Sequence, residues 1–310
     1  MSNIDVSKTT GVLSDVDIKT RIENKELVIH PYDERNLTPL GYNLSYTKFI
    51  YSVNNKILSE IFVEENKLFC YVEPNDTVLI MSHEAVWLSK ALLGTFHSKV
   101  GIVSKGFGHI STTLDPDWEG PLLFSLNNPT NQRLRMEIGD EKAGRIEYKT
   151  FVTLILYEMI TCSKIEQNNQ PARIDILKSI KDSLGTSKYD KELLHILNNF
   201  QSLEIIRIGL SSCDNHDSKI NEFKKKYNDF NVQIGDCIKQ IDKIRNEKST
   251  KKKLIKILII CLIVIVFIVI LGVALNSYLT SNYSILSLIA IINSIAIFIS
   301  REVYTKITKG

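Results

Sequence analysis

Two long apolar runs near the C-terminus constrain this chain more than any other feature. They cover residues 254–275 and, approximately, residues 283–299, with a short uncharged connector between them. A membrane-spanning helix needs about 20 predominantly apolar residues. Basic residues precede the first run and follow the second, and positive charge favours the cytoplasmic side. The sequence therefore predicts a two-helix membrane hairpin with both ends in the cytoplasm; the alternative is a pair of buried core helices.

The composition fits a cytoplasmic protein that carries such a hairpin. The chain has 310 residues, which allows about two domains before the hairpin. Its net charge of +3 comes largely from the flanks of the apolar runs, so we expect no nucleic-acid partner. The five cysteines are scattered and predict neither a zinc site nor a disulfide framework. The N-terminus has no signal peptide, so we expect the N-terminal part in the cytoplasm.

Residues 1–165 are expected to form a mainly β domain, because short apolar runs alternate with turn residues as in a barrel or jelly roll. The clearest strand patterns cover residues 67–72, 77–81, 121–126 and 151–157. Ser14 and Asp17 resemble a capping box and predict one short helix before the strands. Residues 166–216 begin with a linker and continue as a helical region. Its amphipathic patterns, at about residues 174–184 and 193–210, predict helices with a packing role.

Residues 217–250 carry a more regular apolar pattern that leads into the membrane segment, residues 251–310. Large apolar side chains follow one another at spacings of three and four: Ile220, Phe223, Tyr227, Phe230, Ile234, Cys237, Ile241 and Ile244. Such spacing is typical of the a and d positions of a coiled coil, so it predicts a self-associating stalk. The alternative is an amphipathic helix that packs against its own domain.

Two groups of motifs in the β region resemble the dCTP deaminase family. Residues 12–18 read Val-Leu-Ser-Asp-Val-Asp-Ile, and residues 37–44 read Leu-Thr-Pro-Leu-Gly-Tyr-Asn-Leu. Residues 114–120 read Leu-Asp-Pro-Asp-Trp-Glu-Gly, similar to the family's Ile-Asp-Pro-Gly-Phe-Glu-Gly turn. The resemblance covers about residues 12–160. It implies the distorted jelly roll that this family shares with the dUTPases, a trimer, and nucleotide sites between subunits.

The phosphate-binding loop that the resemblance implies is only partly retained. Ser98, Lys99 and Gly101 match the family's loop, and Lys99 supplies one cation. The two loop arginines are replaced by His97 and Ile102. Arginine grips phosphate in two places and lysine does not, so we expect weaker binding of a triphosphate.

The catalytic positions that the resemblance implies are also altered. The glutamate that serves the deaminases as general acid/base corresponds to Ser125, and a serine hydroxyl cannot shuttle protons near neutral pH. Asp115 is retained, either to orient a sugar hydroxyl and water or simply as a turn residue. Trp118 and Phe107 either wall a base pocket or pack in the core. The candidate nucleotide-binding residues are Ser98, Lys99, Gly101, Asp115 and Ser125.

We therefore interpret the chain as a membrane-anchored nucleotide sensor, similar in architecture to bacterial anti-phage effectors. The degenerate β domain would bind a deoxynucleotide or cyclic nucleotide and control oligomerisation of the hairpin in the inner membrane, with a trimer favoured. One alternative is a membrane-tethered nucleotide hydrolase that uses Asp115. A second is a non-enzymatic trimeric scaffold. We expect no cofactor apart from Mg²⁺ with a bound triphosphate, and lipid as the other partner.

Overall fold

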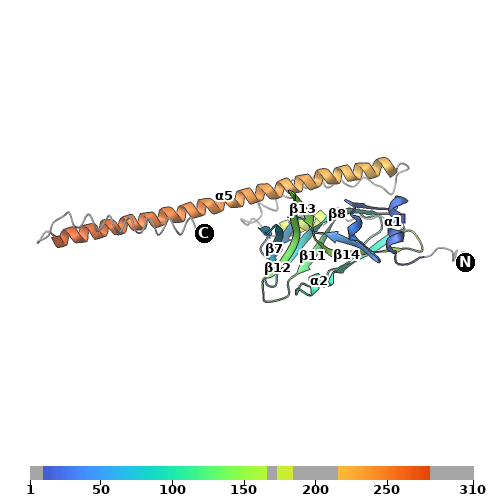
Figure 1. Cartoon of the computed structure of the whole chain (residues 1–310), viewed down its shortest axis with the longest axis horizontal. Coiled ribbons are helices and arrows are strands. Elements are labelled where there is room, and N and C mark those ends of the chain that lie inside the picture. The colour runs from blue at the N-terminus through green and yellow to red at the C-terminus, as the bar shows by residue number, and fades with distance from the viewer. Residues whose placement is uncertain (1–9, 166–172, 184–215, 280–310) are drawn as a thin grey trace, which may run out of the picture. The chain divides into compact units, whose positions relative to one another are not determined.

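The computed structural model describes residues 10–165, 173–183 and 216–279 (Figure 1). The chain forms two compact units, residues 1–242 and residues 243–310. The helix expected at residues 193–210 and the apolar run at residues 283–299 lie outside the described residues.

Three antiparallel sheets make up the N-terminal domain, so the prediction of a mainly β domain is confirmed. The first sheet contains β1 (Leu27–His30), β8 (Thr77–Leu88), β4 (Ile50–Ser52) and β5 (Ile57–Leu58), with β11 (Glu119–Asn127) also on β8. The second contains β10 (Ser111–Leu114), β9 (Leu92–Ser98), β14 (Thr150–Glu158), β3 (Gly41–Ser45) and β2 (Leu37–Thr38). The third contains β13 (Arg145–Tyr148), β12 (Leu134–Lys142), β7 (Lys67–Val72) and β6 (Phe62–Glu64).

The described helices are few, and most are short. They are α1 (Asp15–Glu23), the 3-10 helix η1 (Glu34–Asn36), α2 (Val100–Val103), α3 (Ile174–Ser183) and α5 (His216–Leu279). α1 begins at the predicted capping box, in which the Asp17 backbone N–H donates to Ser14 Oγ and the Ser14 N–H donates to the Asp17 carboxylate. α3 matches the first helix expected in the helical region.

The two faces of β8 explain how the domain is built. Its residues alternate, and one set, Val78, Ile80, Val86 and Leu88, packs into the core between the sheets. The other set, Leu79, Met81, Ala85 and Trp87, points out of that core and is also buried. A strand that is apolar on both faces needs a cover on each side. The second cover is the first part of α5.

The first part of α5 packs on its own domain, so the prediction of a self-associating coiled coil is wrong for this stripe. Seven of the eight apolar residues in the predicted stalk are buried against the outer face of the first sheet, and we call these seven the α5 stripe: Ile220, Phe223, Tyr227, Phe230, Ile234, Cys237 and Ile241. The eighth, Ile244, is 46% exposed. A helix lying on a sheet and a helix in a coiled coil need the same 3–4 spacing, and the bare apolar sheet face decides between them.

The second part of α5 contains the first apolar run. Nine of its large hydrophobic side chains are exposed: Leu254, Ile255, Leu258, Ile259, Ile260, Leu262, Ile263, Ile265 and Phe267. Within the described ranges, no helix has both the length and the apolarity that crossing a bilayer requires. The expected span at residues 254–275 is therefore not confirmed. This run is the end of one 64-residue helix that begins as an amphipathic segment.

Candidate functional site

An open cleft of about 830 Å³ lies in the β domain, and we call it the Lys99 cleft. Segments from η1, β3, β8, β13 and the start of α2 form its walls. Its lining is mostly polar and charged: Pro31, Tyr32, Asp33, Glu34, Arg35, Asn36, Ser45, His83, Glu84, Lys99, Ile146, Glu147, Tyr148, Lys149 and Thr150. A large pocket with convergent polar groups is the first place to look for a ligand site.

A bulge in β8 aims two titratable residues at the Lys99 cleft. In the β8–β11 pairing, Pro121 lies opposite Ala85 and Leu123 lies opposite Met81, so three residues of β8 face one residue of β11. Bulges of this kind turn side chains out of the regular ladder. Here the extra residues include His83 and Glu84, both of which line the cleft.

Glu84 is a buried carboxyl group in the wall of this cleft. It is 1% exposed, and its Oε2 accepts a 2.8 Å hydrogen bond from the Ser45 backbone N–H. Burial raises the pKa of Glu84 to about 7 and lowers the pKa of the adjacent His83 to about 4. A carboxyl group that titrates near neutral pH is suited to proton transfer. The sequence pattern missed Glu84, although a carboxylate inside the apolar β8 run was a usable signal.

Lys99 lies where β9 passes into α2. Its Nζ is 2.5 Å from Thr150 Oγ1, and burial lowers the pKa of Lys99. Among the described residues, no carboxylate lies within ion-pair distance of this ammonium group. A partly desolvated cation without a carboxylate partner favours an anionic ligand.

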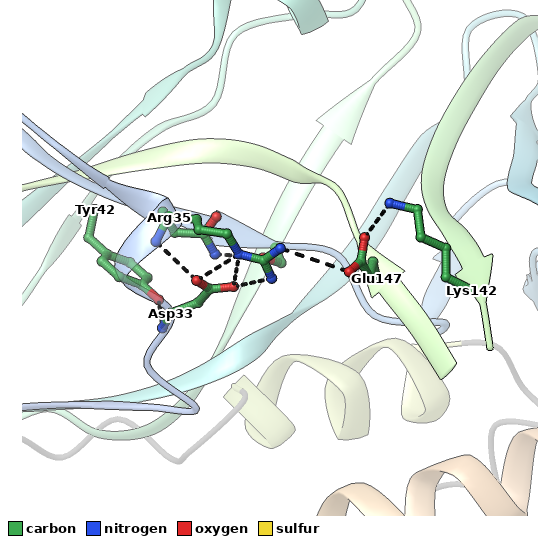
Figure 2. A network of polar contacts seen from close by, with 7 residues as sticks. Asp33, Arg35, Tyr42, Lys142 and Glu147 are labelled. Carbon is green, nitrogen blue, oxygen red and sulfur yellow. Dashed lines mark hydrogen bonds and ion pairs between the residues drawn. The ribbon is translucent and has the colours of Figure 1, made fainter. Parts of the chain in front are cut away.

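Charged residues at the rim of the cleft already pair with one another. Figure 2 shows Arg35 between Asp33 and Glu147, and Lys142 on the far side of Glu147. Arg35 Nη2 is 2.7 Å from Asp33 Oδ2, Arg35 Nη1 is 3.8 Å from Glu147, and Lys142 Nζ is 2.7 Å from Glu147. The hydrogen bonds from Arg35 and from Lys142 hold the pKa values of Asp33 and Glu147, respectively, below their usual range. The rim is therefore neutralised, in contrast to Lys99.

The other two loop residues have local roles in the structure. Ser98 Oγ accepts a hydrogen bond from the Ile110 backbone N–H, which ties β9 to the residue before β10. Gly101 is exposed in α2, and a Cβ at this position would meet no atom within 4 Å. Space therefore does not demand glycine at position 101.

Asp115 and Ser125 line two neighbouring cavities, which we call the hairpin cavities after the turn that joins β10 to β11. Asp115 lines one of about 120 Å³, and Ser125 lines one of about 240 Å³. The two cavities have four lining residues in common: Thr112, Leu123, Phe124 and Arg173. Lys99 and Gly101 line neither of them. The structure therefore brings Asp115 and Ser125 together and separates them, within one protomer, from the lysine of the loop.

The aromatic and imidazole side chains near these cavities have different surroundings. Trp118 is 5% exposed and donates a 2.9 Å hydrogen bond from Nε1 to the Gly120 carbonyl, while it also lines the cavity of Asp115. Phe107 is a core residue. His109 lines the Ser125 cavity, and His97 Nε2 lies 3.0 Å from Thr95 Oγ1. In the described part of the chain, no three His, Cys, Asp or Glu residues cluster as metal ligands would.

The comparisons with known proteins match the β domain, which carries most of the residues that line these cavities. The sequence pattern of the dCTP deaminase-like family matches residues 12–149. A dCTP deaminase from Pyrococcus horikoshii is 27% identical over 116 residues, which cover 37% of this chain and 71% of that protein. A probable deoxyuridine 5'-triphosphate nucleotidohydrolase from Sulfolobus islandicus rod-shaped virus 1 is 30% identical over 115 residues, covering 37% of this chain and 70% of that protein.

Among solved structures, the 2'-deoxycytidine 5'-triphosphate deaminase from Agrobacterium tumefaciens is similar, with a TM-score of 0.38 and 14% identity; the match covers 49% of each chain. Arg173, which lines both hairpin cavities, lies outside the residues that the family pattern matches. On the sequence matches to the β domain, the chain belongs to the dCTP deaminase-like family.

Proposed function

We propose that the chain binds a nucleotide, either a pyrimidine deoxynucleotide or a cyclic nucleotide signal, and does not deaminate it. The observation that carries this proposal is Lys99, a partly desolvated cation in the wall of the Lys99 cleft whose side chain contacts a hydroxyl group. A phosphate oxygen would give this ammonium group the charged partner that the described residues do not provide. Ser98 and Gly101, as backbone neighbours of Lys99, belong to the same proposed phosphate site.

The absence of deamination is proposed from the surroundings of Ser125. The described residues that line its cavity include hydroxyl groups, an imidazole and a guanidinium, but no carboxylate. Deamination of a pyrimidine ring needs a positioned group that takes and returns a proton. Asp115 lies in the neighbouring cavity and is proposed to contact the sugar.

The site is proposed to be completed between protomers, in a trimer. Lys99 and the pair Asp115 and Ser125 line separate cavities of one protomer. A nucleotide with its phosphates at Lys99 and its base at a hairpin cavity would then contact two copies of the chain. Mg²⁺ would accompany the phosphates of a triphosphate.

The α5 stripe is proposed as the element that responds to the ligand. Tyr227 Oη donates a 2.5 Å hydrogen bond to the carbonyl of His83, a residue of the cleft wall. Asn228 Oδ1 lies 2.9 Å from Nε2 of His30, which precedes Pro31 of the same wall. A ligand shifts an equilibrium only when it binds one state better than the other. Through these contacts, movement of the cleft wall on ligand binding would directly affect how α5 docks on the domain.

For the C-terminal segment we propose a membrane-perturbing role at the bacterial inner membrane, with both ends of the chain in the cytoplasm. Support comes from the apolar sequence of residues 254–275 and from the nine exposed hydrophobic side chains of this run. Contiguous exposed apolar surface marks contact with a protein or a lipid. The biological setting proposed is anti-phage defence, in which the nucleotide signal controls membrane damage.

One observation favours a second function, nucleotide hydrolysis. Glu84 lines the same cleft as Lys99 and has a pKa near 7, which suits a general base for an attacking water molecule. In this reading Glu84 or Asp115 activates the water, and the chain releases pyrophosphate. A third candidate, a scaffold that only assembles the chain, predicts no nucleotide binding.

Calorimetry and product analysis on the full chain separate these functions. We expect binding of dCTP, dUTP or a cyclic dinucleotide, with no ammonia and no pyrophosphate released. Lys99→Glu should weaken binding at least about 100-fold, because it places a like charge beside phosphate. Lys105→Glu changes the same charge at a position that does not line the cleft, and should bind as wild type does. Released pyrophosphate that disappears in Glu84→Gln would establish the hydrolase instead.

Liposome flotation tests the membrane role separately. The full chain should float with vesicles of bacterial lipid composition, and a chain with Leu262→Ser and Ile265→Ser should not. Cells that lose residues 254–310 should keep intact membranes when the system is triggered. Equal flotation of the wild type and the double variant would count against lipid contact by this run.

A further inference from the structure

Arg173, directly before helix α3, reaches the hairpin cavities from outside the residues that the family pattern matches. Arg173 lines the cavities of both Asp115 and Ser125, and Ile176 lines the larger one. Family similarity ends at residue 149, so these two side chains come from the additional part of this chain. We propose that residues 173–177 are an in-chain plug for the hairpin cavities, and that a ligand entering there displaces Arg173. This inference rests on the proposed nucleotide binding.

The size of the cavities argues for a plug rather than an open subsite. With α3 in place, the two cavities measure about 240 and 120 Å³. Pockets that hold small ligands usually measure about 300–1,000 Å³. A nucleotide base and sugar therefore need the space that Arg173 and Ile176 occupy.

The charges around Arg173 also favour a plug over an anion site. Arg173 Nε and Nη2 donate to Asp175 at 3.1 and 2.9 Å. These bonds raise the pKa of Arg173, and the charge of Asp115 raises it further. The guanidinium is therefore compensated by two carboxylates. An incoming phosphate would gain little from a cation whose charge is already satisfied on both sides.

The plug is connected to the α5 stripe through Leu177. Leu177 is fully buried and belongs to the same apolar cluster as the α5 stripe and the outer face of β8. It directly follows Ile176 on α3, and Ile176 lines the Ser125 cavity. Lifting this turn of α3 out of the cavity therefore pulls on Leu177. Entry of a ligand would thus weaken the packing of α5 on the domain.

Calorimetric titration of the full chain with dCTP, dUTP and a cyclic dinucleotide tests the plug. Arg173→Ala should bind about tenfold more tightly than wild type, because the competing occupant is weakened. Lys178→Ala removes a cation from the same helix at a residue that does not line the cavities, and should leave the affinity unchanged. Equal or weaker binding by Arg173→Ala overturns the plug. Absence of binding in every protein would instead defeat the proposed function, and the plug with it.

The two tryptophans of the chain give a second readout. Trp118 lines a hairpin cavity, and Trp87 is buried in the cluster under α5. In Trp118→Phe, Trp87 is the single tryptophan, and saturating nucleotide should shift its emission to longer wavelength as the cluster opens. Binding is measured again in this variant, since Trp118 lines the cavity. Unchanged emission with nucleotide bound overturns the link between the plug and α5.

Discussion

The two parts of helix α5 are built from similar apolar residues but have opposite surroundings. In residues 216–242 the α5 stripe recurs every three or four positions and is buried on the domain's own sheet. In residues 254–267 apolar side chains stand on every side of the helix, and nine large ones are exposed. A single sheet face can cover only one stripe of a helix.

This difference indicates that the apolar surface of the first part stabilises the fold and that of the second part serves a function. The α5 stripe completes the domain by covering β8, which is apolar on both faces. The run at 254–267 exposes more apolar surface than is usual for a monomer. We propose that lipid covers this surface. Substitutions in the two parts should therefore affect different properties.

The largest effect on stability should come from a fully buried aromatic residue of the α5 stripe. Phe223 is fully buried, and Phe223→Ala should lower the free energy of unfolding by about 3–5 kcal/mol. Val232→Ala, at a position that is 64% exposed on the same helix, should change it by less than about 0.5 kcal/mol. Urea unfolding followed by tryptophan fluorescence measures both. Similar values for the two variants would mean that the helix does not depend on this docking.

Two adjacent members of the predicted heptad pattern distinguish docking from self-association. Ile241 is 2% exposed and Ile244 is 46% exposed. We expect Ile241→Asp to cost about 3 kcal/mol, because a buried apolar contact is replaced by a charge. Ile244→Asp should cost much less. In a coiled coil, both changes would lower the fraction of oligomer measured by analytical ultracentrifugation. Such a shared effect would support self-association of this segment.

Glu84 and His83, in the β8 bulge, should make the free energy of unfolding depend on pH in opposite directions. Glu84 has a raised pKa, so its stabilising contribution is complete below about pH 4.5 and is lost as the pH rises through about 7. His83 has a lowered pKa, so stability is lost as the pH falls from about 6.5 to about 4. The two slopes oppose each other in wild type.

Single substitutions should expose each slope in turn. The unfolding free energy of Glu84→Gln should rise with pH between about 4 and 6.5, by up to about 3 kcal/mol. That of His83→Gln should fall between about pH 4.5 and 7. Denaturation at a series of pH values measures both. Identical pH profiles for the two variants would show that neither group is held as described.

The smallest effect concerns the hydrogen bond that fixes α5 to the bulge. Tyr227→Phe removes the donor to the His83 carbonyl and keeps the aromatic packing. It should lower the free energy of unfolding by about 1 kcal/mol. A neutral result in chemical denaturation would assign the role of Tyr227 to packing alone.

Local patterns predicted the parts of the fold that depend on neighbouring residues. The strand at residues 67–72 has the predicted limits, and the capping box of Ser14 and Asp17 starts α1. The pattern could not identify the partner of the α5 stripe, because the spacing is the same for a sheet and for a second helix. The apolar run of β8 held the missing signal, since both of its faces needed a cover.

The candidate site was harder to predict because its geometry depends on the pairing of distant strands. Sequence similarity selected Lys99, Asp115 and Ser125, but only the fold shows that the lysine lines a different cavity. Glu84 reaches the cleft through the β8 bulge, and Arg173 lies directly before α3. The carboxylate of Glu84 inside an apolar run was a local signal, but its place in the cleft depends on strand pairing, and nothing in the local pattern marks Arg173.

The most direct test of the account is amide hydrogen exchange of the full chain, with and without saturating dCTP, in wild type and in Lys99→Glu. If a nucleotide in the Lys99 cleft loosens the docking of α5, bound nucleotide should speed exchange at residues 216–242 in wild type. It should change nothing in Lys99→Glu. Unchanged exchange of these residues, with calorimetry showing that wild type is saturated with nucleotide, would contradict this prediction.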